Sequence, residues 1–246
     1  MKIEYIGKCL YVEVVENRKK KGILAVGDLH IGYEEVLNRS GVFVTRKMFN
    51  EMIEYFDRVF EKVGKVDYVV LLGDVKHYFG KILRQEWNDV LGLFDYFKEK
   101  LMKEGMVVVV RGNHDVILDP IVLKRSRVEV WDYFVVEKIC FLHGNRDFKE
   151  IYDKRIKMWV MGHGHPAVKL SDSVRVEKYK CFLFGMFRGR GVIIVPSFFD
   201  YSEGSDPREN DLGLAWDFDF ERFDVKIVGD EMDLRVLDFG KLGKLK

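Results

Sequence analysis

Short apolar runs that end in glycine and a polar residue recur along the first half of the chain. Residues 23–26, 66–72 and 106–110 are rich in valine, leucine and isoleucine, as strands buried on both faces are. Between them, apolar side chains recur at helical spacing over residues 45–63 and 85–103. This alternation of strands and amphipathic helices predicts a parallel sheet with helices on its face.

The second half has a different pattern, because its apolar runs follow one another with little room for helices. We expect strands there at residues 128–131, 134–136, 139–142, 158–161, 174–176, 181–184, 192–195, 214–218, 225–228 and 234–239. A hairpin of strands at 2–5 and 10–15 begins the chain. The whole predicts an α/β (α+β) fold, a four-layer sandwich of two mixed β-sheets packed face to face with helices on the outside. Without a proline-rich or serine-rich linker, we expect residues 1–246 to form a single domain.

Composition narrows the class of protein. Apolar residues are 48% of the 246 and the formal net charge is +1, so the chain can bury a core and has no overall attraction to nucleic acid or membranes. No apolar run reaches the roughly 18 residues that a membrane span needs, and the first residues do not resemble a secretion signal. We therefore expect a cytoplasmic protein. Cys9, Cys140 and Cys181 form no Cys-x-x-Cys pair and should be buried free thiols.

All six histidines follow predicted strands within a few residues. Ligands gather at the carboxyl ends of strands in open α/β sheets, so this clustering predicts one site and not scattered core histidines. The candidate metal ligands at these strand ends are Asp28, His30, Asp74, Asn113, His143, His163 and His165.

The seven candidate ligands offer a mixture of oxygen and nitrogen atoms. They are too many for one tetrahedral zinc ion and suit two cations that share a bridging carboxylate. Because no thiolate takes part, we expect two borderline divalent ions, manganese first among them, with iron, zinc, cobalt or nickel as alternatives. Two cations about 3.5–4 Å apart acidify a shared water and stabilise a transferring phosphoryl group. The set therefore indicates phosphate ester hydrolysis.

Two neighbours of Asn113 complete the candidate chemistry. His114 is not needed as a ligand and is our candidate acid for the leaving group. Asp115 either orients or charge-stabilises His114, or it is a solvated or strand-capping carboxylate.

The motifs resemble those of the calcineurin-like metallophosphoesterases. In order along the chain, Asp-x-His is 28–30, Gly-Asp is 73–74, Gly-Asn-His-Asp is 112–115, a lone histidine is 143, and Gly-His-x-His is 162–165. The resemblance implies a two-sheet sandwich flanked by helices. It also implies two ligand sets, one of Asp28, His30, Asp74 and His165 and one of Asp74, Asn113, His143 and His163. Asp74 would then bridge the ions, and a hydroxide between them would attack the phosphate.

Residues 27–35 and 73–80 are similar, more narrowly, to a predicted phosphoesterase group common in archaea, whose bacterial relatives include DNA-ligase-associated phosphodiesterases. His77 resembles a histidine of the recombination-repair nuclease branch, which implies that His77 and His114 bind the substrate. We therefore expect hydrolysis of phosphodiesters, of DNA, RNA or nucleotides, with catalytic roles for Asp74 and His114. No membrane partner is expected, and a homo-oligomer stays open.

Alternatives remain at this point. The protein could be a phosphomonoesterase or small-nucleotide hydrolase, or a metal-dependent interaction scaffold, although scaffolds of this kind lose ligand residues and none is lost here. Four basic residues either track a phosphate backbone or form a solvated strand face, and these are Lys178, Lys180, Arg188 and Arg190. We expect Phe198, Phe199 and Tyr201 to pack against the sheet and not to stack on a base.

Overall fold

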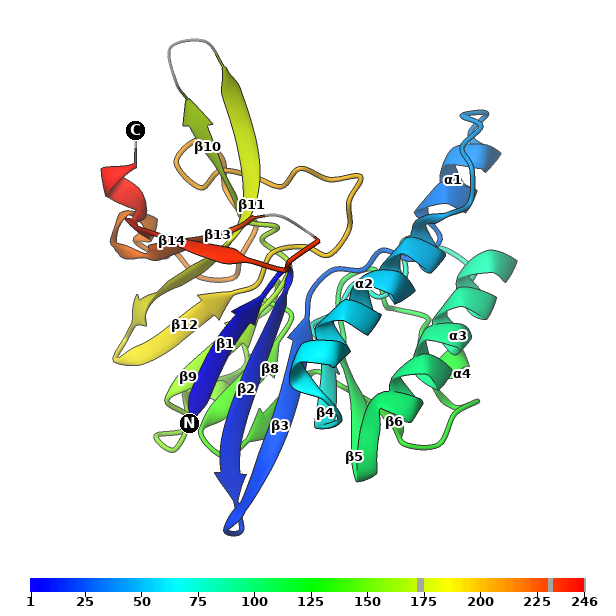
Figure 1. The fold of residues 1–246 in the computed structure, drawn as a ribbon, viewed down its shortest axis with the longest axis horizontal. Coiled ribbons are helices and arrows are strands. Elements are labelled where there is room, and N and C mark those ends of the chain that lie inside the picture. The colour runs from blue at the N-terminus through cyan, green and yellow to red at the C-terminus, as the bar shows by residue number, and fades with distance from the viewer. Residues whose placement is uncertain (172–174, 230–231, 246) are drawn as a thin grey trace.

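Two β-sheets face each other in the computed structural model, which describes residues 1–171, 175–229 and 232–245 (Figure 1). The first sheet has the strand order β1-β2-β3-β4-β5-β6. Its strands are β1 (Lys2–Ile6), β2 (Cys9–Glu16), β3 (Lys19–Val26), β4 (Val66–Leu71), β5 (Leu101–Val110) and β6 (Val128–Trp131). Strands β3 to β6 run parallel, so their carboxyl ends share one edge of the sheet.

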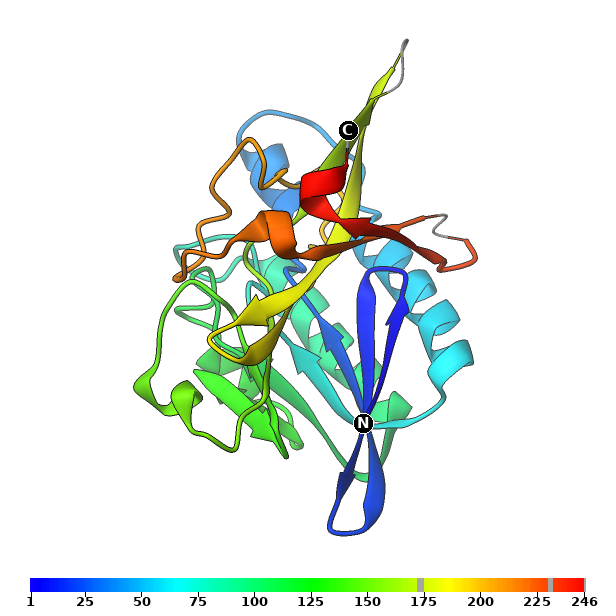
Figure 2. The same cartoon turned by 90° about the vertical axis from the view of Figure 1, so that its left-hand side faces the viewer.

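The second sheet has the order β14-β13-β11-β12-β9-β8-β7, and β10 pairs with β11. Its strands are β7 (Tyr133–Val136), β8 (Ile139–Leu142), β9 (Met158–Met161), β10 (Ala167–Ser171), β11 (Val176–Phe187), β12 (Arg190–Ile194), β13 (Asp224–Val228) and β14 (Val236–Lys241). Strands β8, β9 and β12 are parallel to one another. The β10 end of β11 projects beyond both sheets (Figure 2).

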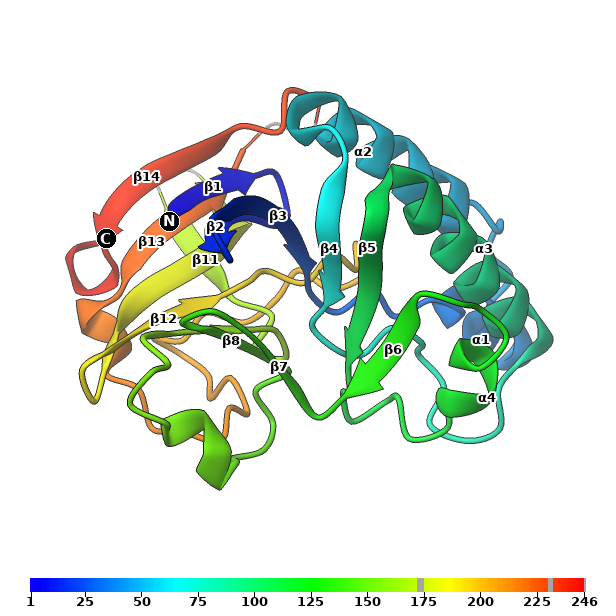
Figure 3. The same ribbon diagram turned by 90° about the horizontal axis from the view of Figure 1, so that it is seen from below.

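The helices cover the outer face of the first sheet (Figure 3). They are α1 (Tyr33–Arg39), α2 (Met48–Val63), α3 (Arg84–Lys100) and α4 (Asp119–Val122). The 3-10 turns η1 (Lys149–Tyr152), η2 (Phe220–Arg222) and η3 (Leu242–Lys244) belong to the second half of the chain and pack on the second sheet. The buried aromatic stripes of α2 and α3, including Phe56 and Phe97, pack on β4 and β5. Within the described ranges, no helix is long and apolar enough to cross a membrane.

Alternation along the strands divides the core into layers. Val69 and Val107 face the helices, whereas their neighbours Val70 and Val108 face the second sheet. Phe141 of β8 lies in this middle layer and is fully buried. The three cysteines are buried free thiols, as predicted.

The predicted fold class is confirmed, with local differences in its elements. Residues 214–218, predicted as a strand, are irregular chain, because Trp216 and Phe218 pack on the outer face of the second sheet and do not pair at its edge. This irregular segment and the 3-10 turns cover the outer face of the second sheet, where helices were expected. The short elements α1 and β10 were not predicted. Of the strand expected at 174–176, residue 174 lies outside the described residues and Val176 begins β11.

Replacement of Phe141 by alanine tests the middle layer of the core. The lost contacts and the cavity left between the sheets should lower the free energy of unfolding by roughly 3–5 kcal/mol. Denaturant titration measures this. The matched control is Phe43→Ala, at a ring that is 89% exposed, which should change stability by less than about 0.5 kcal/mol. Equal effects of the two substitutions would contradict this packing.

Candidate metal centre

Five strand ends bring all seven candidate ligands to one edge of the two sheets. Asp28 and His30 follow β3, Asp74 follows β4, Asn113 follows β5, His143 follows β8, and His163 and His165 follow β9. The sheets are joined here by a parallel bridge between Gly27 and Ser197, and the Phe198 N–H donates to the Gly27 carbonyl at 2.9 Å. The site therefore lies where the chains leaving both sheets meet.

The backbone is strained at most of these positions. Five of the seven have left-handed φ angles between 41° and 63°, namely Asp28, His30, Asp74, His163 and His165. For residues other than glycine such angles cost about 1–3 kcal/mol each and cluster at functional sites. Hydrogen bonds hold them: the His30 N–H donates to the Asp74 carbonyl at 2.9 Å, and the His163 N–H to the Asp28 carboxylate at 3.0 Å.

Gly73 and Gly112 belong to two of the motifs, and candidate ligand side chains approach both closely. A Cβ on Gly112 would lie 2.2 Å from Asp74 Oδ1, and a Cβ on Gly73 would lie 2.4 Å from His143 Nδ1. Side chains at either position would collide with the candidate ligands. Both glycines thus allow the strand ends to converge on Asp74.

The ligand atoms fall into two groups. Those of Asp28, His30 and His165 lie within 4.8 Å of one another, and so do those of Asp74, His143 and His163. The groups adjoin each other, since His143 Nδ1 lies 3.9 Å from Asp28 Oδ1 and His30 Nε2 lies 3.9 Å from Asp74 Oδ2. This geometry has room for two neighbouring cations.

His143 shows why the centre needs positive charge. Its Nδ1–H donates to the Leu72 carbonyl at 2.7 Å, which turns Nε2 toward Asn113 Oδ1 at 3.1 Å and the Asp74 carboxylate. Burial lowers the pKa of His143, but the hydrogen bond and charge of Asp74 outweigh it and raise the pKa to about 9. Nε2 therefore faces acceptor atoms and requires either a proton or a cation between them, so the donor set fits a metal ion.

Two carboxyl groups and two further imidazoles of the centre are in the protonation states that ligate metals. Burial opposes ionisation of Asp28 and Asp74, yet the imidazoles around them hold both carboxyl pKa values below their usual range. Burial also lowers the pKa of His30 to about 3 and that of His163 below its ordinary value. Ionised carboxylates and neutral imidazoles offer free electron pairs to a cation.

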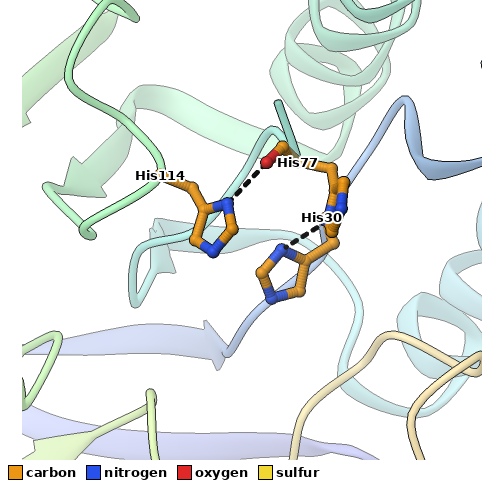
Figure 4. Close-up of side chains that lie close together, drawn as sticks. All are labelled: His30, His77 and His114. Carbon is orange, nitrogen blue, oxygen red and sulfur yellow. Dashed lines mark hydrogen bonds between the residues drawn. The ribbon is translucent and has the colours of Figure 1, made fainter. Parts of the chain in front are cut away.

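His77 and His114 lie beside this centre with His30 (Figure 4). His77 Nδ1 faces His30 Nδ1 at 3.3 Å, and burial lowers the pKa of His77 to about 4. His114 Nδ1 is hydrogen-bonded to the His77 carbonyl oxygen, so its Nε2 is directed to the centre, 3.9 Å from Asp74 Oδ2. The His77 carbonyl thus fixes which nitrogen of His114 exchanges a proton.

Two roles were considered for Asp115 from the sequence, and its contacts are those of a strand-capping carboxylate. It is fully buried, and its carboxylate accepts the backbone N–H groups of Val75 at 3.0 Å and Gly112 at 3.1 Å. It therefore ties the ends of β4 and β5 together. The His114 ring is oriented by the His77 carbonyl instead, a backbone group that side-chain types cannot reveal.

Other side chains take definite places around the centre. Phe199 is buried and its ring lies 5.1 Å from that of His30, in agreement with packing and not base stacking. Phe79, whose role no sequence signal indicated, lies against His114 with the two rings tilted. The four basic residues are divided: Lys180 donates to the Phe199 carbonyl, whereas Arg190 donates to the Tyr152 carbonyl. They form no single basic face.

Two of three comparisons with known proteins found matches. A model of the calcineurin-like phosphoesterase family matches residues 22–228. The solved structure of nuclease MPE from Pseudomonas putida is similar with a TM-score of 0.54 and 17% identity, over 93% of this chain and 100% of that one. A single mutant of Vps29 from Entamoeba histolytica matches with a TM-score of 0.37 and 14% identity, over 89% and 99% of the two chains. A search of curated proteins found no match.

Fold, family model and convergent Asp and His side chains together define a metal-dependent phosphoesterase. The chain belongs to the calcineurin-like phosphoesterase family, and its grouped Asp and His side chains could hold metal ions.

Divalent cations should stabilise the fold through these ligands. Mn²⁺ at about 100 times its dissociation constant should add about 2.7 kcal/mol to the free energy of unfolding for each ion bound. Asp28→Asn removes a buried ligand charge and should lose much of this gain. Thermal unfolding with and without Mn²⁺ measures it, and Asp132→Asn, at a carboxylate that is 56% exposed, is the matched control. Full stabilisation of Asp28→Asn would contradict the assignment.

Proposed function

We propose that this protein hydrolyses phosphodiester bonds of nucleic acid or nucleotides with two divalent cations, manganese being our first candidate. Asp28, His30 and His165 would hold one ion, and Asn113, His143 and His163 the other, with Asp74 between them. When bound, the ions supply an acidified water and stabilise charge on the phosphoryl oxygens. Support comes from the two adjoining ligand groups and the family match.

The observation that carries the proposal is the fixed orientation of His114. Because its Nδ1 is hydrogen-bonded to the His77 carbonyl oxygen, the proton that the charged ring can release lies on Nε2, beside Asp74. An acid at this place can protonate the alkoxide that leaves the phosphate. Asp74 also accepts the backbone N–H of His114 at 2.9 Å, so ligand and acid are positioned by one contact.

A diester suits the surroundings better than a monoester does. The rings that border the centre include the neutral imidazole of His77 and the aromatic rings of Tyr33, Phe79 and Phe199. A diester has a single negative charge and a second organic substituent, which uncharged rings accommodate. A monoester has nearly two charges at neutral pH and no second substituent.

Turnover of paired substrates tests this function. In the presence of Mn²⁺, bis(p-nitrophenyl) phosphate should be hydrolysed faster than p-nitrophenyl phosphate, and single-stranded DNA, duplex DNA and RNA are assayed in parallel. Asp74→Asn should abolish turnover, while Asp132→Asn should retain it. A faster monoester reaction would identify a phosphomonoesterase. Bound metal without any hydrolysis would favour an interaction scaffold.

The role of His114 is tested separately from metal binding. His114→Ala should lower the rate of diester hydrolysis by about 100-fold or more, the contribution typical of a general acid, because the leaving alkoxide loses its proton donor. Metal content measured by elemental analysis should equal that of the wild type. Loss of bound metal together with activity would show that His114 is a ligand.

A further inference from the structure

Phe79 is a large apolar side chain that stays exposed at the edge of the metal centre. Its ring lies against the imidazole of His114, with centroids 3.7 Å apart and planes tilted by 34°, yet 57% of the residue is accessible to solvent. One side of the ring is thus covered by the candidate acid. The rest is open beside the site where the substrate would lie.

The loop that carries Phe79 is held by two fully buried charged side chains. The Lys76 ammonium donates to the Tyr78 carbonyl. The Glu86 carboxylate accepts the backbone N–H of Tyr78 at 2.7 Å and that of Leu83 at 2.8 Å. Buried charges are costly unless they are paired and hydrogen-bonded. Here both buried charges are hydrogen-bonded to Tyr78 and its neighbours, and these bonds fix the backbone immediately before Phe79.

The place of Phe79 relates it to one side of the scissile bond. His114 Nε2 is the atom that protonates the leaving oxygen in the proposed reaction, and the Phe79 ring lies against that same imidazole. In that reaction the group attached to the leaving oxygen would pass next to the open part of the Phe79 ring. Bases stack on aromatic side chains regardless of sequence, because every base has a π-face.

We propose that Phe79 contacts the substrate by stacking on the base of the leaving nucleoside, so that the enzyme selects nucleotides whose base is free to stack. This inference rests on the proposed phosphodiesterase function and adds a specificity-determining residue to it. Base stacking on an aromatic side chain should change kcat/KM by roughly tenfold.

Dinucleoside monophosphates that differ only in their bases test the contact. Four substrates are compared with Mn²⁺: thymine on both sugars, on either sugar alone, and on neither. Product analysis identifies the leaving nucleoside. The wild type should hydrolyse substrates with a base on the leaving sugar about tenfold faster than their baseless analogues, and Phe79→Ala should remove this difference. Phe79→Trp should retain it.

Two comparisons separate stacking from a role in positioning His114. The substrate without bases gives the effect of Phe79→Ala that does not depend on a base. The loss of kcat/KM on substrates with a base on the leaving sugar should exceed that effect by about tenfold. Phe43→Ala, at an exposed ring in the connection between α1 and α2, should behave as the wild type on all four substrates. An equal loss on all four with Phe79→Ala would assign Phe79 to positioning and overturn the proposal.

The remaining outcomes distinguish failure of this contact from failure of the proposed function. If the wild type hydrolyses all four substrates at the same rate, the stacking contact is wrong and phosphodiester hydrolysis stands. A base effect that persists in Phe79→Ala also overturns the assignment. If the wild type with bound Mn²⁺ hydrolyses none of the diesters, the proposed function fails and this contact with it.

Discussion

The rest of the centre depends on two buried carboxylates, those of Asp28 and Asp74, whose negative charge has to be balanced. They are 0% and 2% exposed, and nearby imidazoles keep both ionised. Negative charge in such surroundings is costly unless positive charge lies against it. The centre therefore favours cations, and the imidazole nitrogens that surround the carboxylates are well suited to share them.

The fold and the strained backbone at the site both bring side chains around these two carboxylates. Parallel strands β3, β4 and β5 of one sheet and β8 and β9 of the other end at the same edge, which alone brings distant residues together. Five candidate ligands have a left-handed backbone at this edge, and their ligand atoms lie in the two groups of the centre. The buried layers of the sandwich offset the cost of this strain, and hydrogen bonds such as that of His30 to Asp74 distribute it.

Much of the fold and of the candidate ligand set could be predicted from the sequence. Physical reasons explain both what was predictable and what was not. Buried parallel strands are unbroken apolar runs, so their ends, with the histidines after them, are visible in the order of residues. The contact of the Phe79 ring with His114 depends on a loop fixed by Glu86, which periodicity cannot show. Residues 214–218 have strand-like alternation, but Trp216 and Phe218 bury their rings on a sheet face without pairing. Backbone acceptors such as Leu72 are likewise not predictable from side chains.

Anomalous diffraction from crystals grown with Mn²⁺ tests the central claim most directly, because it locates the cations without recourse to activity. We predict two manganese peaks about 3.5–4 Å apart, one beside Asp28, His30 and His165 and the other beside Asp74, His143 and His163. A single peak, or peaks away from both groups, would contradict a two-cation centre at the meeting edge of the sheets.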